Sequence, residues 1–153
     1  MFAHFLLLAA IASTDAPTAS TSASDQEAPV GKLVGSKIVD GNGAHDRSVR
    51  IPKPWKQIDP TALVVINRLV WEVQMLVQGI VEKDGTISSI EPVHCKVTSG
   101  DKLLPVAENA DTCTSAFEVS KAAYSQWRYY PATRDGVPVR VYVTQQFYVK
   151  CNR

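Results

Sequence analysis

Histidine and cysteine are the side chains of this sequence that could serve as bases, nucleophiles or metal ligands. His94 and Cys95 are neighbours, but adjacent side chains of an extended strand point to opposite faces and cannot share a proton. His45 and Asp46 lie in a polar stretch without further ligands at a spacing typical of zinc sites. The sequence also has no Gly-rich phosphate loop and no hydrolase motif. We therefore expect no enzyme, no metal site and no cofactor.

An aromatic and basic stretch, QWRYYPATRDGVPVRVYV, could instead contact a ligand through stacking. Trp127, Arg128, Tyr129 and Tyr130 lie together at its start, as in proteins that stack the bases of single strands. The chain has 16 Lys and Arg against 15 Asp and Glu, a net charge of +1, whereas a polyanion binder usually has a basic excess. We expect these aromatics to belong to the core, and no nucleic-acid partner.

The N-terminus has the composition of an export signal followed by a leader. Residues 1–12 form a short apolar run that ends in Ala-Ile-Ala, a pattern typical of a cleaved secretory signal. A buried helix or an uncleaved anchor are the alternatives, although a membrane span needs about 20 apolar residues. Residues 13–29 are rich in Ser, Thr, Ala and Pro and predict a disordered leader.

The rest of the chain divides near residue 60. Residues 30–59 are expected to be extended or loop-like, with room for one short strand, because Pro52 and Pro54 interrupt regular structure. Residues 60–153 are expected to form the folded domain, since apolar periodicity is clear only there.

One alternating stretch and a turn signal predict a β-hairpin at the start of this domain. From residue 70 to 82 apolar and polar residues alternate with a period of two, as in a half-buried strand. Asp84-Gly85 follows, and Asp-Gly between two apolar runs is a strong hairpin signal. Residues 87–97 are the returning strand.

A helix and a third strand follow the hairpin. Ser115 and Glu118 have the spacing of a capping box, and Pro131 is expected to end the helix. Residues 139–149 alternate again and predict a strand with one apolar face.

These elements predict an α+β fold of the order β-β-α-β. The helix crosses over so that the third strand pairs with the free side of the first strand. The expected result is a small three-stranded antiparallel sheet in the order 2-1-3, with one helix packed on one face. The third strand lies at an edge, with unpaired backbone groups.

The combination of GIVEKDGTISSIEPV, WRYYPATRDGVPV and QQFYV resembles the C-terminal domain of the TonB family, the periplasmic energy transducers of Gram-negative bacteria. The resemblance covers about residues 70–149. It implies the β-β-α-β order, a periplasmic location, and pairing of the last strand with an extended segment of an outer-membrane receptor, linked to TonB-dependent transport. Full transducers also carry an anchor and a long Pro-rich spacer, which this sequence does not show. The alternative is therefore an accessory or structural envelope protein without energy coupling.

If the last strand pairs with a partner, the expected contact residues are those on its polar face. These are Arg140, Tyr142, Thr144, Gln146 and Tyr148, which would adjust specificity while the backbone supplies affinity. The same edge could pair with its own copy in a homodimer.

Export implies an oxidising compartment, in which two of the three cysteines can form a disulfide. Cys113 precedes the expected helix and lies near the ends of both outer strands, so it can pair with Cys95 or with Cys151. Cys95 and Cys151 are separated by the central strand, about 10 Å, which is too far for a bond. The Cys95–Cys113 pair is preferred because it needs less rearrangement.

Overall fold

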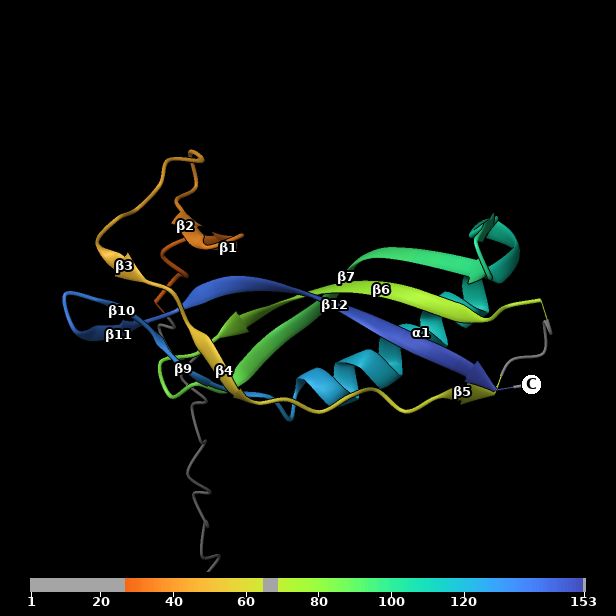
Figure 1. The fold of residues 1–153 in the computed structure, drawn as a ribbon. Helices are drawn as coiled ribbons and strands as arrows, with labels where there is room; N and C mark the ends of the chain where they lie inside the picture. Colours follow the sequence, from red (N-terminus) through yellow and green to blue (C-terminus); the bar gives the residue numbers. More distant parts are fainter. Residues whose placement is uncertain (1–26, 65–68, 153) are drawn as a thin grey trace, which may run out of the picture.

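A computed structural model describes residues 27–64 and 69–152 of the chain (Figure 1). The expectations for residues 1–12 and 13–26 fall outside these ranges. The N-terminal strands are β1 (Lys32–Val34), β2 (Lys37–Val39), β3 (Val49–Arg50), β4 (Lys53–Lys56) and β5 (Leu63–Val64). The remaining elements are β6 (Glu72–Val81), β7 (Ile87–Ser99), β8 (Lys102–Leu104), η1 (Ala107–Asn109), α1 (Ala110–Tyr124), β9 (Arg128–Tyr130), β10 (Ala132–Arg134), β11 (Val137–Val139) and β12 (Val141–Asn152).

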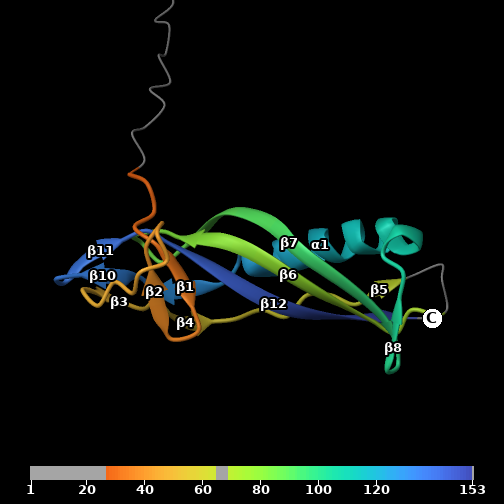
Figure 2. The ribbon, with the colours of Figure 1, turned by 90° about the horizontal axis from the view of Figure 1, so that it is seen from above.

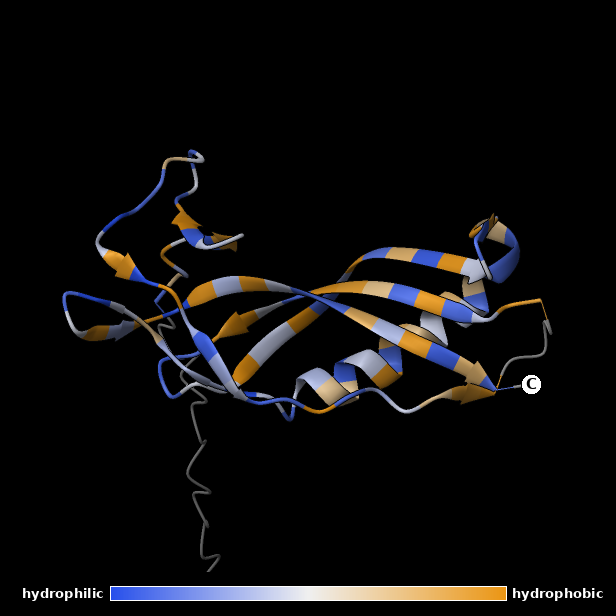
Figure 3. Cartoon of the chain, in the orientation of Figure 1, coloured by the Kyte–Doolittle hydropathy of each residue, from blue (hydrophilic) through white to orange (hydrophobic). Residues whose placement is uncertain are grey.

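Three long antiparallel strands form the centre of the molecule. β6 lies between β7 and β12, and β12 pairs with β6 without interruption from Val141 opposite Val81 to Lys150 opposite Glu72. Apolar and polar residues alternate along β6 and β12 (Figure 3). One face therefore carries Val73, Met75 and their neighbours into the core beneath α1.

The sheet is larger than the sequence indicates, and the expectation of a small three-stranded antiparallel sheet is wrong. Seven strands form a mixed sheet in the order β2-β1-β12-β6-β7-β8, and β5 also pairs with β12. Both β1 and β5 run parallel to β12, so the expectation that this strand is a free edge along its length is also wrong. Two smaller sheets, β11-β10-β3 and β4-β9, complete the fold.

The added strands come mainly from residues 30–59, where only one short strand was expected. These strands are two to four residues long, too short to show a period of two. β1, β3 and β4 pair with β12, β10 and β9, which follow much later in the chain. Pro54 is tolerated in β4 because a two-stranded sheet has only edge strands.

Helix α1 begins and ends earlier than expected. Ser115 lies inside the helix, whose N-cap residue is Asn109, so the predicted capping box is wrong. The helix ends at Tyr124, after which the N–H groups of Gln126 and Trp127 donate to carbonyls three residues earlier and tighten the last turn. Pro131 is therefore not the stop, since strand β9 intervenes.

An aromatic cluster joins the end of the helix to the sheet. Trp127, Tyr124 and Phe147 make edge-on contacts with centroid distances of 5.5 to 5.7 Å. All three are buried, and so is Tyr129, whereas Tyr130 is 65% exposed. The core role expected for this aromatic stretch holds for Trp127 and Tyr129 but not for Tyr130.

The predicted hairpin turn packs against strand β9. Gly85 has φ +83°, and its N–H donates to the carbonyl of Glu82. A Cβ on Gly85 would lie 2.0 Å from the carbonyl oxygen of Tyr129. The N–H of Tyr129 donates to the Gly85 carbonyl at 2.9 Å. Only glycine fits this conformation and this close approach.

Cys95 and Cys113 form a disulfide, with an S–S distance of 2.04 Å and a Cα–Cα distance of 6.0 Å. This confirms the preferred pairing and ties the first turn of α1 to β7. Cys151, near the end of β12, is a half-buried free thiol. In the parts of the chain that the structure describes, no helix is long and apolar enough to span a membrane.

Candidate functional site

The backbone groups of β12 alternate between its two sides. The N–H of Tyr142 donates to Gly31, and the carbonyl of Arg140 accepts from Val30, both on the side away from β6. Because the pairing with β6 has no register shift, all even-numbered residues of β12 direct their N–H and C=O groups to that outer side. The odd-numbered residues face β6.

Within the described ranges, strands pair with the outer side of β12 only at its two ends. β1 pairs at Tyr142, and β5 pairs at Cys151 and Asn152. Between them, no strand among the described residues is paired with Thr144, Gln146 or Tyr148 on the outer side of β12. The side-chain amide of Gln145 donates to the Gln146 carbonyl at 2.9 Å, which is a local substitute for a missing strand. The result is an open stretch of edge between two parallel strands.

A hollow of about 600 Å³ lies beside this open edge and is called the β12 groove below. The linker between β4 and β5 forms its other wall and runs beside β12 to reach β5 (Figure 2). The indole N–H of Trp127 holds the linker by donating to the carbonyl of Ile58 at 2.8 Å. The groove is lined by Gln57, Asp59, Pro60, Ala62, Trp127, Gln145, Gln146, Phe147, Tyr148 and Lys150.

The lining of the groove combines apolar contact with polar groups. Trp127 and Phe147 are buried and in contact at 5.5 Å, whereas Asp59 and Lys150 are exposed. Known ligand sites have the same combination and volumes of about 300 to 1,000 Å³. The arrangement can bind an extended chain but offers no nucleophile with a base.

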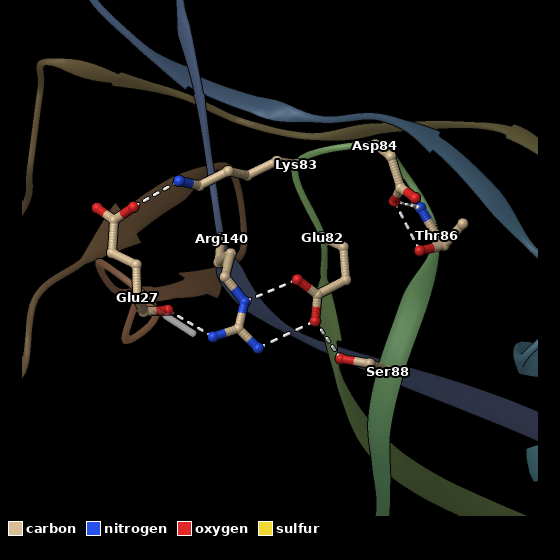
Figure 4. Close-up of polar contacts among 7 residues, drawn as sticks. All are labelled: Glu27, Glu82, Lys83, Asp84, Thr86, Ser88 and Arg140. Atoms are coloured by element: carbon tan, nitrogen blue, oxygen red, sulfur yellow. Dashed lines mark hydrogen bonds and ion pairs between the residues drawn. The ribbon is translucent and has the colours of Figure 1, made fainter. Parts of the chain in front are cut away.

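Arg140, which was expected to contact a partner, is instead engaged within the protein (Figure 4). Its guanidinium donates to the Glu82 carboxylate at 2.7 and 3.0 Å and to the Glu27 carbonyl. Its side chain is only 8% exposed. The hydrogen bond from Arg140, followed by one from Ser88, lowers the pKa of Glu82. Arg140 therefore fastens the chain entering β1 to the hairpin.

The other four residues expected to contact a partner differ in how accessible they are. The backbone of Tyr142 is taken by β1. Thr144 is half-buried, whereas Gln146 and Tyr148 are exposed and line the β12 groove. The linker wall at residues 57–62 and the role of Trp127 were not expected, because no sequence pattern brings these segments to β12.

The opposite long strand, β7, has a very different edge. β8 covers only Val97 to Ser99, but the remainder of β7 has two register irregularities, a proline at position 92 and a positive φ of 49° at Ser89. Bulges and prolines are devices that prevent edge pairing. Between Val141 and Val149, β12 has no proline, charge or register shift.

The His, Cys and Asp side chains that could serve in catalysis or metal binding do not assemble into one site. No group of three or more His, Cys, Asp or Glu that could hold a metal ion occurs in the described ranges. Cys95 is in the disulfide, and His94 is exposed on β7. Hydrogen bonds from Ser48 and then from Arg134 lower the pKa of Asp46 to about 2, so Asp46 is a structural carboxylate.

Comparison with known proteins does not assign this chain to a group. No known protein family matches the sequence, and no curated protein matches it either. The geometry of β12 and the resemblance of its motifs are therefore the features that bear on function.

Proposed function

We propose that this chain is a protein-binding domain that adds an extended segment of a partner to the open edge of β12. The observation that carries the proposal is the row of outward N–H and C=O groups at Thr144, Gln146 and Tyr148, beside the β12 groove. Strand addition uses such groups for affinity and the neighbouring pockets for specificity.

The contrast between the two long edge segments supports this function. An edge without a role is normally protected, as β7 is by its bulges and proline. β12 retains a regular edge over its open stretch, so the unprotected edge is the one that lies beside a groove.

The TonB resemblance suggests the kind of partner. It favours a periplasmic protein that binds the extended TonB box of an outer-membrane receptor and takes part in TonB-dependent transport. The flanking strands β1 and β5 leave only the stretch between Tyr142 and Cys151 open. A thin, extended segment fits there more readily than the edge of a second folded copy.

The test is isothermal titration calorimetry of the full chain with a peptide that spans the TonB box of a receptor encoded near it. Gln146→Pro removes one outward N–H without removing a hydrogen bond to β6, and proline is accepted on that side of an edge strand. We expect the variant to fold and to bind roughly tenfold more weakly, since one hydrogen bond and its surrounding fit are lost.

Gln145→Pro is the matched control. The backbone N–H of Gln145 faces β6, so this proline removes a hydrogen bond to β6 and should lower the free energy of unfolding. Equal affinity of the parent and a folded Gln146→Pro variant would refute strand addition at β12. If the parent binds no peptide but forms a dimer that Gln146→Pro disrupts, the edge serves self-association instead.

A further inference from the structure

A second exposed surface lies on the two-stranded sheet of β4 and β9. We call it the basic-aromatic patch, and it consists of Lys53, Trp55, Lys56, Arg128 and Tyr130. All four residues of β4 are exposed, Trp55 at 57% and Tyr130 at 65%. Large aromatic side chains that lie together in solvent are a feature of binding surfaces.

The patch is held in shape by strand pairing and by ring contact. Lys53 lies opposite Tyr130, and Lys56 lies opposite Arg128, so these side chains share one face of the small sheet. The rings of Trp55 and Tyr130 are 6.4 Å apart. On the other face, Tyr129 is buried, which fixes the sheet to the body of the protein.

The positive charges of the patch are not neutralised within the described ranges. Neither lysine forms an ion pair there. Arg128 donates to the backbone carbonyls of Ser125 and Trp127, which are uncharged. Hydrogen bonds from Thr86 are the main cause of the lowered pKa of Asp84, and the nearby charge of Arg128 lowers this pKa a little further. The patch therefore presents more positive than negative charge.

The patch continues directly into the β12 groove. Lys56 precedes Gln57, which lines the groove, and Arg128 follows Trp127, which forms part of its apolar lining. A segment that leaves the groove along the linker, at Gln57, would thus meet the patch. Charge complementarity across such a surface selects the partner and speeds association.

We propose that the partner segment carries acidic residues beside its strand-forming part, and that these residues bind over the basic-aromatic patch. This inference depends on the proposed strand addition at β12. The carboxylates pair with Lys53 and Lys56, while the apolar parts of the same segment cover Trp55 and Tyr130. The patch thereby distinguishes acidic extended segments from neutral or basic ones.

The test compares three synthetic peptides with one alternating Val-Thr core, flanked at both ends by three Glu, three Gln or three Lys residues. Calorimetry at low salt should show the Glu-flanked peptide binding roughly tenfold more tightly than the Gln-flanked one, because exposed ion pairs are individually weak but two or three act together. The preference should shrink at high salt, which screens exposed charges.

Lys53→Glu/Lys56→Glu should abolish the preference for the Glu-flanked peptide. The matched control, Lys96→Glu/Lys102→Glu, makes the same charge change on β7 and β8, at exposed positions, and should keep the preference. Equal affinity of the Glu- and Gln-flanked peptides would overturn the inference while leaving strand addition in place.

Failure of all three peptides to bind would overturn both proposals. Binding to phosphatidylglycerol vesicles is measured as well. If Lys53→Glu/Lys56→Glu abolishes vesicle binding and the parent shows no preference among the peptides, the patch serves an anionic membrane surface and the inference is wrong.

Discussion

Replacing Glu82 by glutamine should destabilise the protein by breaking its most buried ion pair. The Arg140 side chain is 8% exposed and that of Glu82 is 19% exposed. Removing one partner of a fully buried pair costs about 3 to 5 kcal/mol, because the remaining charge stays buried. Glu82 is partly exposed, and Arg140 keeps its bond to the Glu27 carbonyl. We therefore expect a loss of about 2 to 3 kcal/mol in the free energy of unfolding.

The loss should also depend on pH in a defined direction. The pKa of Glu82 is lowered from its ordinary value of 4.5, chiefly by the hydrogen bond from Arg140. A carboxyl group whose pKa is lower in the folded protein stabilises the fold above its unfolded pKa, and this contribution is lost as the pH falls through the folded pKa. The difference between parent and Glu82→Gln should be full at neutral pH and shrink below about pH 4.5.

Urea unfolding followed by tryptophan fluorescence measures this difference, since Trp127 is buried beside Tyr124 and Phe147. Glu91→Gln is the control, because Glu91 is exposed on β7 and should change stability by less than about 0.5 kcal/mol. A Glu82→Gln loss as small as that of the control, or one that stays constant from pH 7 to about pH 3.5, would refute the reasoning.

Three further substitutions test the fold, each by urea unfolding. Gly85→Ala should cost more than about 2 kcal/mol, because the new Cβ would lie 2.0 Å from the Tyr129 carbonyl at a positive φ. Cys95→Ala/Cys113→Ala should cost about 3 kcal/mol, since the bridge closes a loop with a separation of 18 residues. Ser120→Ala should raise stability by about 1 kcal/mol, because its hydroxyl is buried without a partner in the described ranges.

Each of these substitutions has an internal comparison. Gly136 has φ +81° but open space around its Cβ position, so Gly136→Ala measures the cost of backbone strain alone. Equal losses of stability in Gly85→Ala and Gly136→Ala would contradict the clash with Tyr129. Reduction of the parent should reproduce the cysteine variant, and a stable reduced protein would show that the bridge contributes little. A loss of stability in Ser120→Ala would mean that the hydroxyl has a partner after all.

Local patterns were sufficient to predict the long central strands. The alternation in β6 and β12 and the Asp84-Gly85 turn are signals within a few residues of each other, and the structure contains both strands and the turn. The Cys95–Cys113 bond was predicted from a helix start close to the second strand, and it forms although Cys95 lies inside β7 and Cys113 inside α1.

Strands that depend on distant partners could not be predicted. β1, β3 and β4 are too short for a periodic pattern, and β4 contains Pro54. Their stability comes from pairing with β12, β10 and β9. The same holds for the candidate site. Unpaired backbone on β12 was expected, but the pairing of β1 and β5 at its two ends was not. The linker wall and the ion pair of Arg140 also depend on tertiary contacts that no local pattern shows.

The unequal edges of the sheet also limit how copies of this protein can aggregate. Growth of a fibre by strand pairing requires two adhesive edges on each molecule, so that every added copy offers a new end. In the described part of the chain, β12 has a regular open stretch between β1 and β5, while β7 is interrupted by bulges and a proline. Of the two long outer strands only β12 offers such a stretch, so misdirected pairing through these strands should stop at a pair rather than continue as a polymer.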